Sequence, residues 1–319
     1  MRLHVKDNKW IVRLFMAILL AAALNSCQHQ QELCLDHDVH RQRPVEIVFD
    51  WSEHPDASPL TMSLYLFPLH GGKSRRYEFN GYHGGTIMLA PDQYTAIAIN
   101  SDTERTTVRN TSSLETFEIW LRGDFAIGQQ RADAPLCNQS DMIWIGQTDN
   151  IDCRYSDSII VRMYEAVCHC TVDVLNVTNH SKVHSVTATL SGMNESISAL
   201  SRQTLTANSA LIGFSMERPM PNTLHSTMLT LGHCGRQRTR DATAACDLPH
   251  LLSLYFTLND GSHCVQSIDV ADQMHSQSIE DCHIVIDTVT VPTTGTPPGG
   301  GLTGTVTDWG DEINIVIRP

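Results

Sequence analysis

The chain has 319 residues, of which 35 are acidic and 22 are basic, so its formal net charge is −13. This length allows two ordinary domains, each large enough to bury its own core. The excess of negative charge repels phosphate backbones and therefore argues against nucleic acid as a partner.

Residues 1–26 show the pattern of a secretory signal peptide. Basic residues precede an uncharged apolar run at residues 14–24, which is shorter than the roughly 20 apolar residues needed to span a bilayer. Leu24-Asn25-Ser26-Cys27 then matches a lipobox, with leucine three residues before a cysteine and a small residue directly before it. We therefore predict that Cys27 becomes the lipid-bearing N-terminus of an exported bacterial lipoprotein. A chance cysteine after an ordinary signal peptide is the alternative.

Without the signal peptide the chain keeps 18 basic and 34 acidic residues, and its formal charge becomes −16. It contains no second apolar run of about 18 residues or more, so attachment to the membrane rests on the acyl chains of Cys27 alone. We expect residues 27–42 to form a tether between the lipid and the folded part of the protein.

After the tether, apolar and polar residues alternate as they do in half-buried β-strands. Gly84-Gly85 is expected to separate two strands, and Asn259-Asp260-Gly261-Ser262 is the strongest turn, because Asp-Gly tolerates the positive φ angles of a tight hairpin. Residues 194–206 are the best candidate for a short helix or an irregular crossover. The expected strands are residues 45–51, 62–68, 75–79, 86–89, 94–100, 117–121, 159–163, 166–177, 186–190, 210–216, 227–231, 251–258, 263–270 and 284–291.

Many short strands with polar turns favour an all-β protein built from antiparallel β-sandwiches. The alternation weakens between residues 120 and 158, which indicates a junction there. We therefore predict two tandem antiparallel β-sandwich domains, at residues 43–140 and 141–319. A single large barrel is the alternative architecture.

The ten cysteines leave nine beyond Cys27, an odd number that cannot all pair within one chain. Two groups contain residue types that bind zinc, the run Cys168-His169-Cys170 and the pair His233-Cys234, but neither has the usual spacing of structural zinc ligands. The two cysteines of the run share one face of a strand with the valines that follow, which favours core packing. A disulfide and a metal site are the alternatives, and we predict no metal ion.

The sequence lacks the common motifs of catalysis and cofactor binding, so we predict no catalytic residue and no cofactor. The histidines are scattered and are interpreted as surface residues. Four tryptophans are candidates for a sugar-stacking platform, although Trp51 is expected in the core: Trp51, Trp120, Trp144 and Trp309.

The end of the chain carries one more alternating stretch, with Ile313, Ile315 and Ile317 on one face. A proline- and glycine-rich segment, residues 292–301, precedes this stretch and would let it extend either to its own sheet or to a neighbouring molecule. Because an exposed apolar strand pairs readily with another chain, we predict that this strand either closes its own sheet or takes part in assembly with a neighbour. We favour closure of its own sheet.

Five stretches follow one another in the first part of the chain: Glu32-Leu33-Cys34-Leu35-Asp36-His37, Val45-Glu46-Ile47-Val48-Phe49-Asp50-Trp51, Tyr65-Leu66-Phe67-Pro68, Phe79-Asn80-Gly81 and Tyr94-Thr95-Ala96-Ile97-Ala98-Ile99-Asn100. In this layout the chain resembles the fimbrillin-like lipoproteins of the Bacteroidales, which implies a location at the outer membrane, exposed at the cell surface. The resemblance implies a fold of two transthyretin-like sandwiches and a structural, non-enzymatic role as a fimbrial anchor or accessory subunit, with fimbrial subunits as partners. A surface protein that binds glycans or host ligands is the alternative, and an enzyme comes third.

Overall fold

The computed structural model describes residues 42–123, 135–201, 209–233, 249–278 and 281–292. Two short helices, η3 (His180–Lys182) and α2 (Ala271–Ser276), accompany the strands. The strands are β1 (Arg43–Asp50), β2 (Thr61–Pro68), β3 (Arg75–Asn80), β4 (Gly84–Leu89), β5 (Gln93–Asn100), β6 (Thr106–Arg109), β7 (Glu118–Leu121), β8 (Leu136–Asn138), β9 (Trp144–Asp152), β10 (Ser158–Glu165), β11 (Cys168–Thr178), β12 (Val183–Asn194), β13 (Ser196–Ser198), β14 (Ser209–Ser215), β15 (Leu224–Thr230), β16 (Leu251–Leu258), β17 (His263–Asp269) and β18 (Asp281–Thr290).

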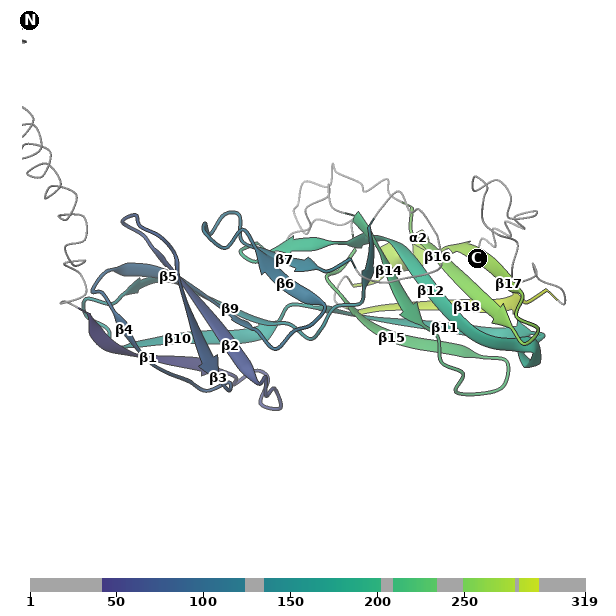
Figure 1. The fold of residues 1–319 in the computed structure, drawn as a ribbon, viewed down its shortest axis with the longest axis horizontal. Helices are drawn as coiled ribbons and strands as arrows, with labels where there is room; N and C mark the ends of the chain where they lie inside the picture. Colours follow the sequence, from purple (N-terminus) through teal and green to yellow (C-terminus); the bar gives the residue numbers. More distant parts are fainter. Residues whose placement is uncertain (1–41, 124–134, 202–208, 234–248, 279–280, 293–319) are drawn as a thin grey trace, which may run out of the picture.

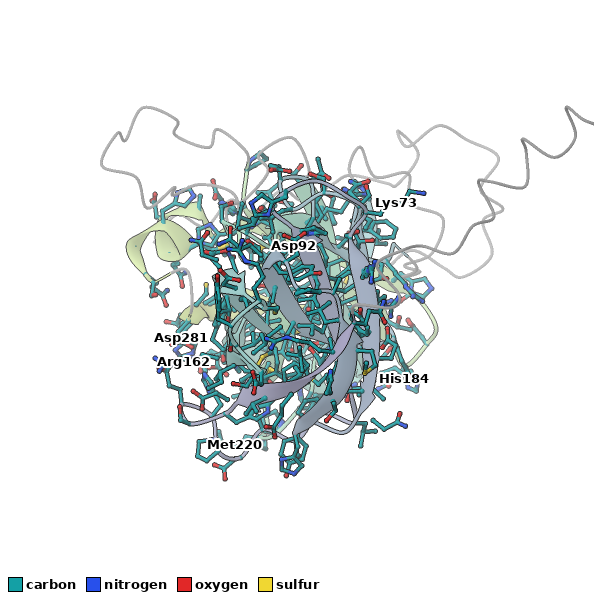
Figure 2. The ribbon with its side chains drawn as sticks, turned by 90° about the vertical axis from the view of Figure 1, so that its left-hand side faces the viewer. Lys73, Asp92, Arg162, His184, Met220 and Asp281 are labelled. Carbon is teal, nitrogen blue, oxygen red and sulfur yellow. The ribbon has the colours of Figure 1, made fainter. Side chains whose placement is uncertain are left out.

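The described part of the chain is almost entirely β, which confirms the predicted all-β class. The molecule is elongated, with β1 and β4 at one end of its long axis and β17 with the end of β18 at the other (Figure 1). Viewed along this axis, side chains fill the space that the strands enclose, and Asp281 at the start of β18 lies at the periphery (Figure 2). None of the described helices is long and apolar enough to cross a membrane.

Seven strands form one sheet, in the order β3-β2-β5-β9-β10-β1-β4. One face of this sheet packs into a core that contains Ile47, Leu64 and Val161. The central strands β2 and β5 are buried on their other face as well, where Tyr65 and Ile97 join a second, larger core. Burial on both faces explains why β2 and β5 have nearly continuous apolar sequences instead of a strict alternation.

Most of the strands after β10, together with the earlier strand β8, form two further sheets, β15-β11-β18 and β17-β16-β12-β14-β8, which both contribute to the larger core. Their sequences alternate more clearly, because each strand buries one face. In β16, for example, Leu252, Leu254 and Phe256 are buried, while the residues between them are partly exposed.

The sheets exchange strands across the expected division at residues 140 and 141. β9 and β10 follow that division in the chain, yet they pair with β5 and β1 in the seven-stranded sheet. In the opposite direction, β7 pairs with β13, and β8 pairs with β14. The sheet pairing thus differs from the expected division, because apolar side chains of β10 such as Val161 and Met163 fill the core of the first sheet.

Most of the expected strands are present, and their bounds shift by a few residues. β6, β8 and β9 were not expected, and the described part of residues 194–206 contains strand β13 in place of a helix. Gly84-Gly85 begins β4 and does not separate it from its neighbours. Three strand pairs are parallel, in contrast to the expected antiparallel pairing: β1 with β10, β11 with β18, and β14 with β8.

Candidate functional site

The outer edge of β18 is the most distinctive surface of the described chain. In its sheet β18 has β11 as its one neighbour, in a long parallel pairing that runs from His169 opposite Asp281 to Thr178 opposite Thr290. Alternate residues of an edge strand direct their backbone N–H and C=O groups away from the sheet, where they invite another strand to pair. In β18 these residues include His283 and Val285.

Two glutamine side chains occupy this edge. Gln273 of α2 donates its amide hydrogen to the carbonyl of Val285 (3.0 Å), and its Oε1 accepts the N–H of Val285 (2.8 Å). Gln277 forms the same pair of bonds with His283, both at 2.7 Å. Each glutamine side chain therefore makes the two hydrogen bonds that the backbone of a neighbouring strand would make at that position. We call His283, Val285 and these two glutamines the capped edge.

The spacing of the capped edge follows from helix and strand geometry. Gln273 and Gln277 are four residues apart, a rise of about 6 Å along a helical turn. His283 and Val285 are two residues apart, about 6.6 Å along a strand. Met274, between the glutamines, is fully buried and fixes the helix against the core. Because these two distances are similar, two glutamines one helical turn apart can bond the backbone groups of two successive outward-facing residues of β18.

A carboxylate and two imidazoles connect all three strands of the same sheet. Asp173 of β11 lies 2.8 Å from Nδ1 of His225 on β15 and 2.6 Å from Nε2 of His283 on β18. Partial burial alone would raise the pKa of Asp173, but the hydrogen bonds from the two histidines outweigh it and hold the pKa below its usual value. The two contacts of Asp173 thus link β18 to the other two strands of its sheet, beside the capped edge.

Two of the three cysteines of this sheet lie in the core, whereas Cys168 at the start of β11 is only partly buried. Cys170 and Cys282 are register partners on β11 and β18, and both are buried free thiols. A hydrogen bond with Cys282, together with burial, raises the pKa of Cys170. His169 points to the opposite, exposed face, where it contacts Glu165 at 2.5 Å. The Cys168-His169-Cys170 run therefore does not converge on one metal ion. Cys234 of the second group lies outside the described residues.

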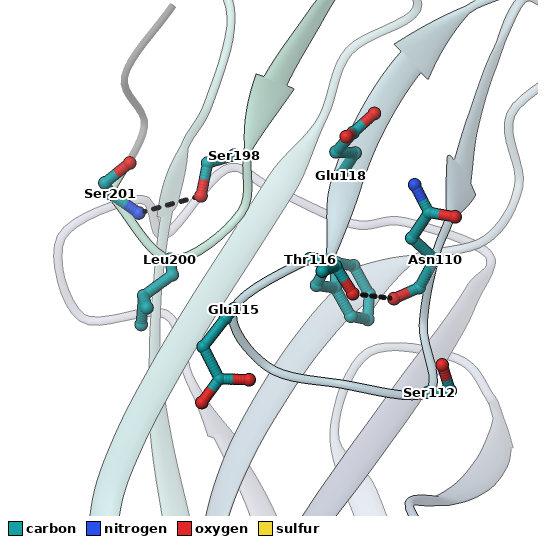
Figure 3. A pocket seen from close by; sticks show the side chains of 9 residues that line it. Asn110, Ser112, Glu115, Thr116, Glu118, Ser198, Leu200 and Ser201 are labelled. Atoms are coloured by element: carbon teal, nitrogen blue, oxygen red, sulfur yellow. Dashed lines mark hydrogen bonds between the residues drawn. The ribbon is translucent and has the colours of Figure 1, made fainter. Parts of the chain in front are cut away.

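A hollow of about 580 Å³ lies beside the small sheet β13-β7-β6 (Figure 3). Hydroxyl groups, one amide and two carboxylates line it together with the apolar side chains of Phe117 and Leu200. Glu118 accepts a 2.5 Å bond from Arg109, while a hydrogen bond from Ser113 lowers the pKa of Glu115. The hollow thus offers hydrogen bonds to a polar ligand, but its lining pairs no hydroxyl with a histidine base.

The tryptophans do not form the coplanar platform on which sugars stack. Trp51 and Trp144 contact each other edge to face, at 81° and 5.7 Å between ring centroids, and both are partly buried. Trp120 is covered by the guanidinium of Arg109, 5.2 Å from its ring centroid, and donates to Glu195 at 2.9 Å. Trp309 lies outside the described residues. Among the described tryptophans, the geometry therefore does not favour glycan stacking.

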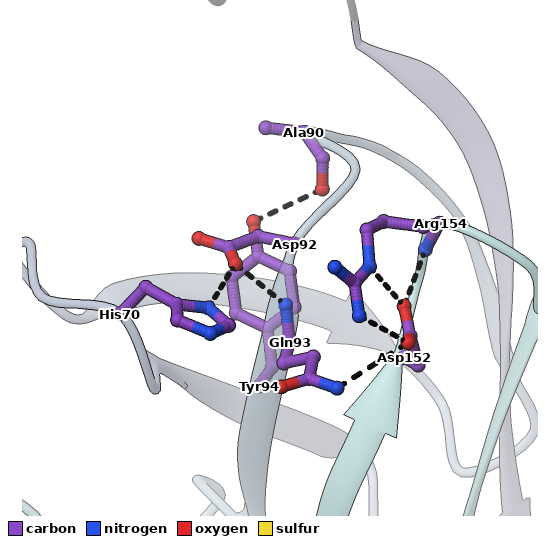
Figure 4. A network of polar contacts seen from close by, with 7 residues as sticks. All are labelled: His70, Ala90, Asp92, Gln93, Tyr94, Asp152 and Arg154. Carbon is purple, nitrogen blue, oxygen red and sulfur yellow. Dashed lines mark hydrogen bonds and ion pairs between the residues drawn. The ribbon is translucent and has the colours of Figure 1, made fainter.

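A network of polar contacts fixes the turns at one end of β5 and β9 (Figure 4). His70 and Asp92 lie 2.8 Å apart, and Arg154 binds Asp152 with bonds of 2.8 and 2.6 Å, which lower the pKa of Asp152. Tyr94 donates to a backbone carbonyl, and its burial raises its pKa to about 12. The bonds of Arg154 and Tyr94 close local turns, and the contact between His70 and Asp92 joins two neighbouring turns, so we interpret the network as structural.

The site residues predicted from the sequence lie outside the described residues. They are the lipidation residue Cys27 and the terminal strand residues Ile313, Ile315 and Ile317. The capped edge was missed, because a single glutamine pair carries no motif until α2 and β18 are placed side by side.

The fold of this chain is similar to that of a protein of known structure. The structure of a candidate adhesin from Bacteroides ovatus matches this chain with a TM-score of 0.62 and 16% identity, over 81% of this chain and 96% of that one. At this identity the similarity shows a shared fold. The fimbrial anchor protein Mfa2 from Porphyromonas gingivalis matches with a TM-score of 0.46 and 15% identity, over 77% of this chain and 90% of that one.

The family follows from the sequence match. Residues 26–215, more than half of the chain, match the family described as Domain of unknown function (DUF5119), and the chain belongs to this family. A candidate fimbrium anchoring subunit of Bacteroides ovatus, Fim4B, is 21% identical over 130 residues, which are 40% of this chain and 39% of that protein. The match spans about two-fifths of that relative's length. These matches confirm the predicted resemblance to fimbrial proteins of the Bacteroidales.

Proposed function

We propose that this protein is a lipid-anchored fimbrial anchor or accessory subunit at the cell surface, with a structural rather than a catalytic role. The observation that carries the proposal is the elongated all-β molecule whose first strand and capped edge lie in opposite halves of the long axis (Figure 1). The match to a candidate fimbrium anchoring subunit and the fold shared with a candidate adhesin support the same role.

The shape suits an anchor because the end that would attach to the membrane and the edge that would contact a fimbrial subunit are separated along the molecule. Cys27 precedes the first described residue by fifteen positions, and β1 begins at one end of the molecule. A lipid on Cys27 would therefore hold this end next to the membrane. The sheet β15-β11-β18 lies in the other half and would present its outer edge to a fimbrial subunit.

We further propose that the capped edge is where a subunit strand pairs. Strand addition to a sheet edge uses the outward backbone groups for affinity and the alternating side chains for selectivity. The glutamines satisfy these groups in the free protein and protect the edge against indiscriminate pairing. An incoming strand would replace both glutamines with equivalent backbone hydrogen bonds.

The test of the function is the retention of fimbriae by the cells that make this protein. Cells that lack the protein are expected to release most of their fimbriae into the medium, and the wild-type gene should restore retention. The Val285→Pro variant should fail to restore it, because proline removes the outward N–H at an edge position that otherwise tolerates it. The measurement is the fraction of fimbrial subunit in the medium against that on the cells.

Val285→Thr is the matched control, since it changes the same side chain but keeps the backbone N–H. It should retain fimbriae as the wild type does. Unchanged retention in cells without the protein would rule out an anchoring role. Restoration by Val285→Pro, with equal amounts of protein at the surface, would leave the anchor role intact and refute the capped edge as the contact.

The terminal strand predicted at Ile313, Ile315 and Ile317 remains a proposal for assembly. Deleting residues 308–319 separates its two possible roles. If the strand closes its own sheet, the truncated protein should be unstable and poorly secreted, which is the result we expect. If it is donated to a neighbour, the truncated protein should fold normally and lose its partner. A stable truncated protein that keeps every partner would contradict both roles.

A further inference from the structure

Three histidines from distant parts of the sequence converge at one end of the β15-β11-β18 sheet. We call His233, His250 and His275 the histidine cluster. One ring nitrogen of each lies within 4.8 Å of the others, and the Nε2 atoms of His250 and His275 are 3.0 Å apart. The ring centroids are 4.8 to 5.8 Å apart.

Each histidine belongs to a different structural element. His233 lies three residues after the end of β15 and forms a β-bridge with Met193 of β12. His250 directly precedes β16, and His275 lies on α2. His233 is 3% exposed and His250 is fully buried, while His275 is half-buried. The cluster is therefore part of the protein interior and not a chance meeting of surface side chains.

The surroundings of His250 fix its orientation. Its Nδ1 lies 3.1 Å from the backbone carbonyl of Ser191, so Nδ1 carries the hydrogen and Nε2 directs its lone pair toward His275. The Ser191 hydroxyl donates to the Pro249 carbonyl and accepts the N–H of Leu251, both at 2.8 Å, which fixes the chain on either side of His250. A hydrogen bond from the second ring nitrogen to a backbone carbonyl is the usual way in which proteins orient a metal-binding histidine.

Gly192 makes room for this ring. Its φ of +72° is in the left-handed region, at a β-bulge between Leu190 and Met193. A Cβ at this position would lie 2.4 Å from Nδ1 of His250. Only glycine therefore lets β12 approach the imidazole closely enough for the Ser191 carbonyl to bind it.

We propose that the histidine cluster binds a Zn²⁺ ion. Imidazole nitrogens are preferred ligands of zinc, and tetrahedral sites with three protein ligands are common for this metal. Zinc–nitrogen bonds of about 2.0–2.1 Å place the ligand nitrogens about 3.3 Å apart. The His250–His275 separation of 3.0 Å is already close to this value. The other nitrogen pairs lie within 4.8 Å, so each must shorten by at most about 1.5 Å to reach that separation.

The ion would add a further link between elements that already meet through the β-bridge of His233 with Met193 and the hydrogen bond from the N–H of Val270 to the carbonyl of His250. His233 lies shortly after β15, His250 directly before β16 in the facing sheet, and His275 on α2. A shared ligand set ties the two sheets and the helix together, so metal binding adds directly to folding stability. The same helix carries Gln273, so the ion would also hold the cap of β18 in place.

The test uses residues 28–319 purified without a polyhistidine tag, because a tag would bind the metal itself. The protein is treated with a chelator, loaded with Zn²⁺, dialysed and analysed for metal by mass spectrometry. We expect one tightly held zinc ion per chain, and a rise of about 5–10 °C in the Tm on adding Zn²⁺. Mg²⁺, which prefers oxygen ligands, should give no rise.

His275→Gln is the decisive variant, since this half-buried residue can be replaced with little loss of packing. It should lose the tightly held ion and the rise in Tm. His184→Gln, which changes an exposed histidine of β12, should behave as the wild type. If His275→Gln does not fold, the rise in Tm of the wild type and its reversal by the chelator decide. Equal zinc retention by wild type and His275→Gln, or no tightly held zinc in the wild type, would overturn the proposal in favour of a histidine cluster held together by hydrogen bonds and packing alone.

Discussion

Replacing Cys27 with alanine is expected to move the protein from the membrane fraction to the soluble fraction. Each buried CH₂ of an acyl chain contributes about 0.8 kcal/mol to membrane binding, and stable anchoring takes more than one chain. Without the thiol, no chain can be attached at the lipobox, and the described residues include no helix able to span a membrane. We expect the membrane-bound share to fall by an order of magnitude or more, together with loss of labelling by an acyl-chain analogue.

Cys34→Ala is the matched control, because it removes a cysteine seven residues further along the same tether. It should leave both the labelling and the membrane fraction unchanged. Labelling that persists in Cys27→Ala would show that the lipid is attached elsewhere. Loss of labelling with full membrane retention would show that another part of the protein holds it at the membrane.

The strands that the sequence predicts well are those that bury a face on their own. β16 and β10 alternate strictly, because each has one buried face and one exposed face. β9 was missed for the opposite reason. Its middle residues, Gln147 to Asn150, are partly or fully exposed, and its place between β5 and β10 depends on partners distant in the chain. Local alternation does not carry this information.

The two sites raised by the structure were beyond local patterns for the same reason. The histidine cluster joins residues separated by 17 and 25 positions, whereas short metal motifs place their ligands within one turn or hairpin. His233 was considered only with its neighbour Cys234, and that spacing argued against zinc. The capped edge depends on a parallel pairing of β18 with β11, more than a hundred residues earlier. Only the fold shows which of the scattered polar residues meet.

Gly84 shows how a local signal can be correct and still be misread. A pair of glycines usually marks a turn, yet Gly84 lies in β4 and pairs with Val48 of β1. Its φ is +98°, and a Cβ would lie 2.1 Å from the carbonyl oxygen of Ile47. The glycine is therefore required by a close approach of two strand backbones, a reason that sequence alone does not distinguish from a turn.

Gly84→Ala is accordingly expected to destabilise the protein by about 2–5 kcal/mol, the sum of an unfavourable positive φ and a forced separation of β4 from β1. Backbone atoms of a paired strand cannot move aside as a flexible side chain can, so the seven-stranded sheet must deform at its edge. Urea unfolding followed by tryptophan fluorescence measures the change, since Trp51 and Trp144 pack against the core of this sheet.

Gly81→Ala separates the two causes. Gly81 has a similar φ of +87°, but a Cβ there would meet no atom within 4 Å. Its replacement should cost only the conformational part, about 1–2 kcal/mol. A Gly84→Ala variant no less stable than Gly81→Ala would mean that β4 does not approach β1 this closely. A clear excess for Gly84→Ala would establish that the contact with the Ile47 carbonyl, and not the backbone angle alone, requires glycine at this position.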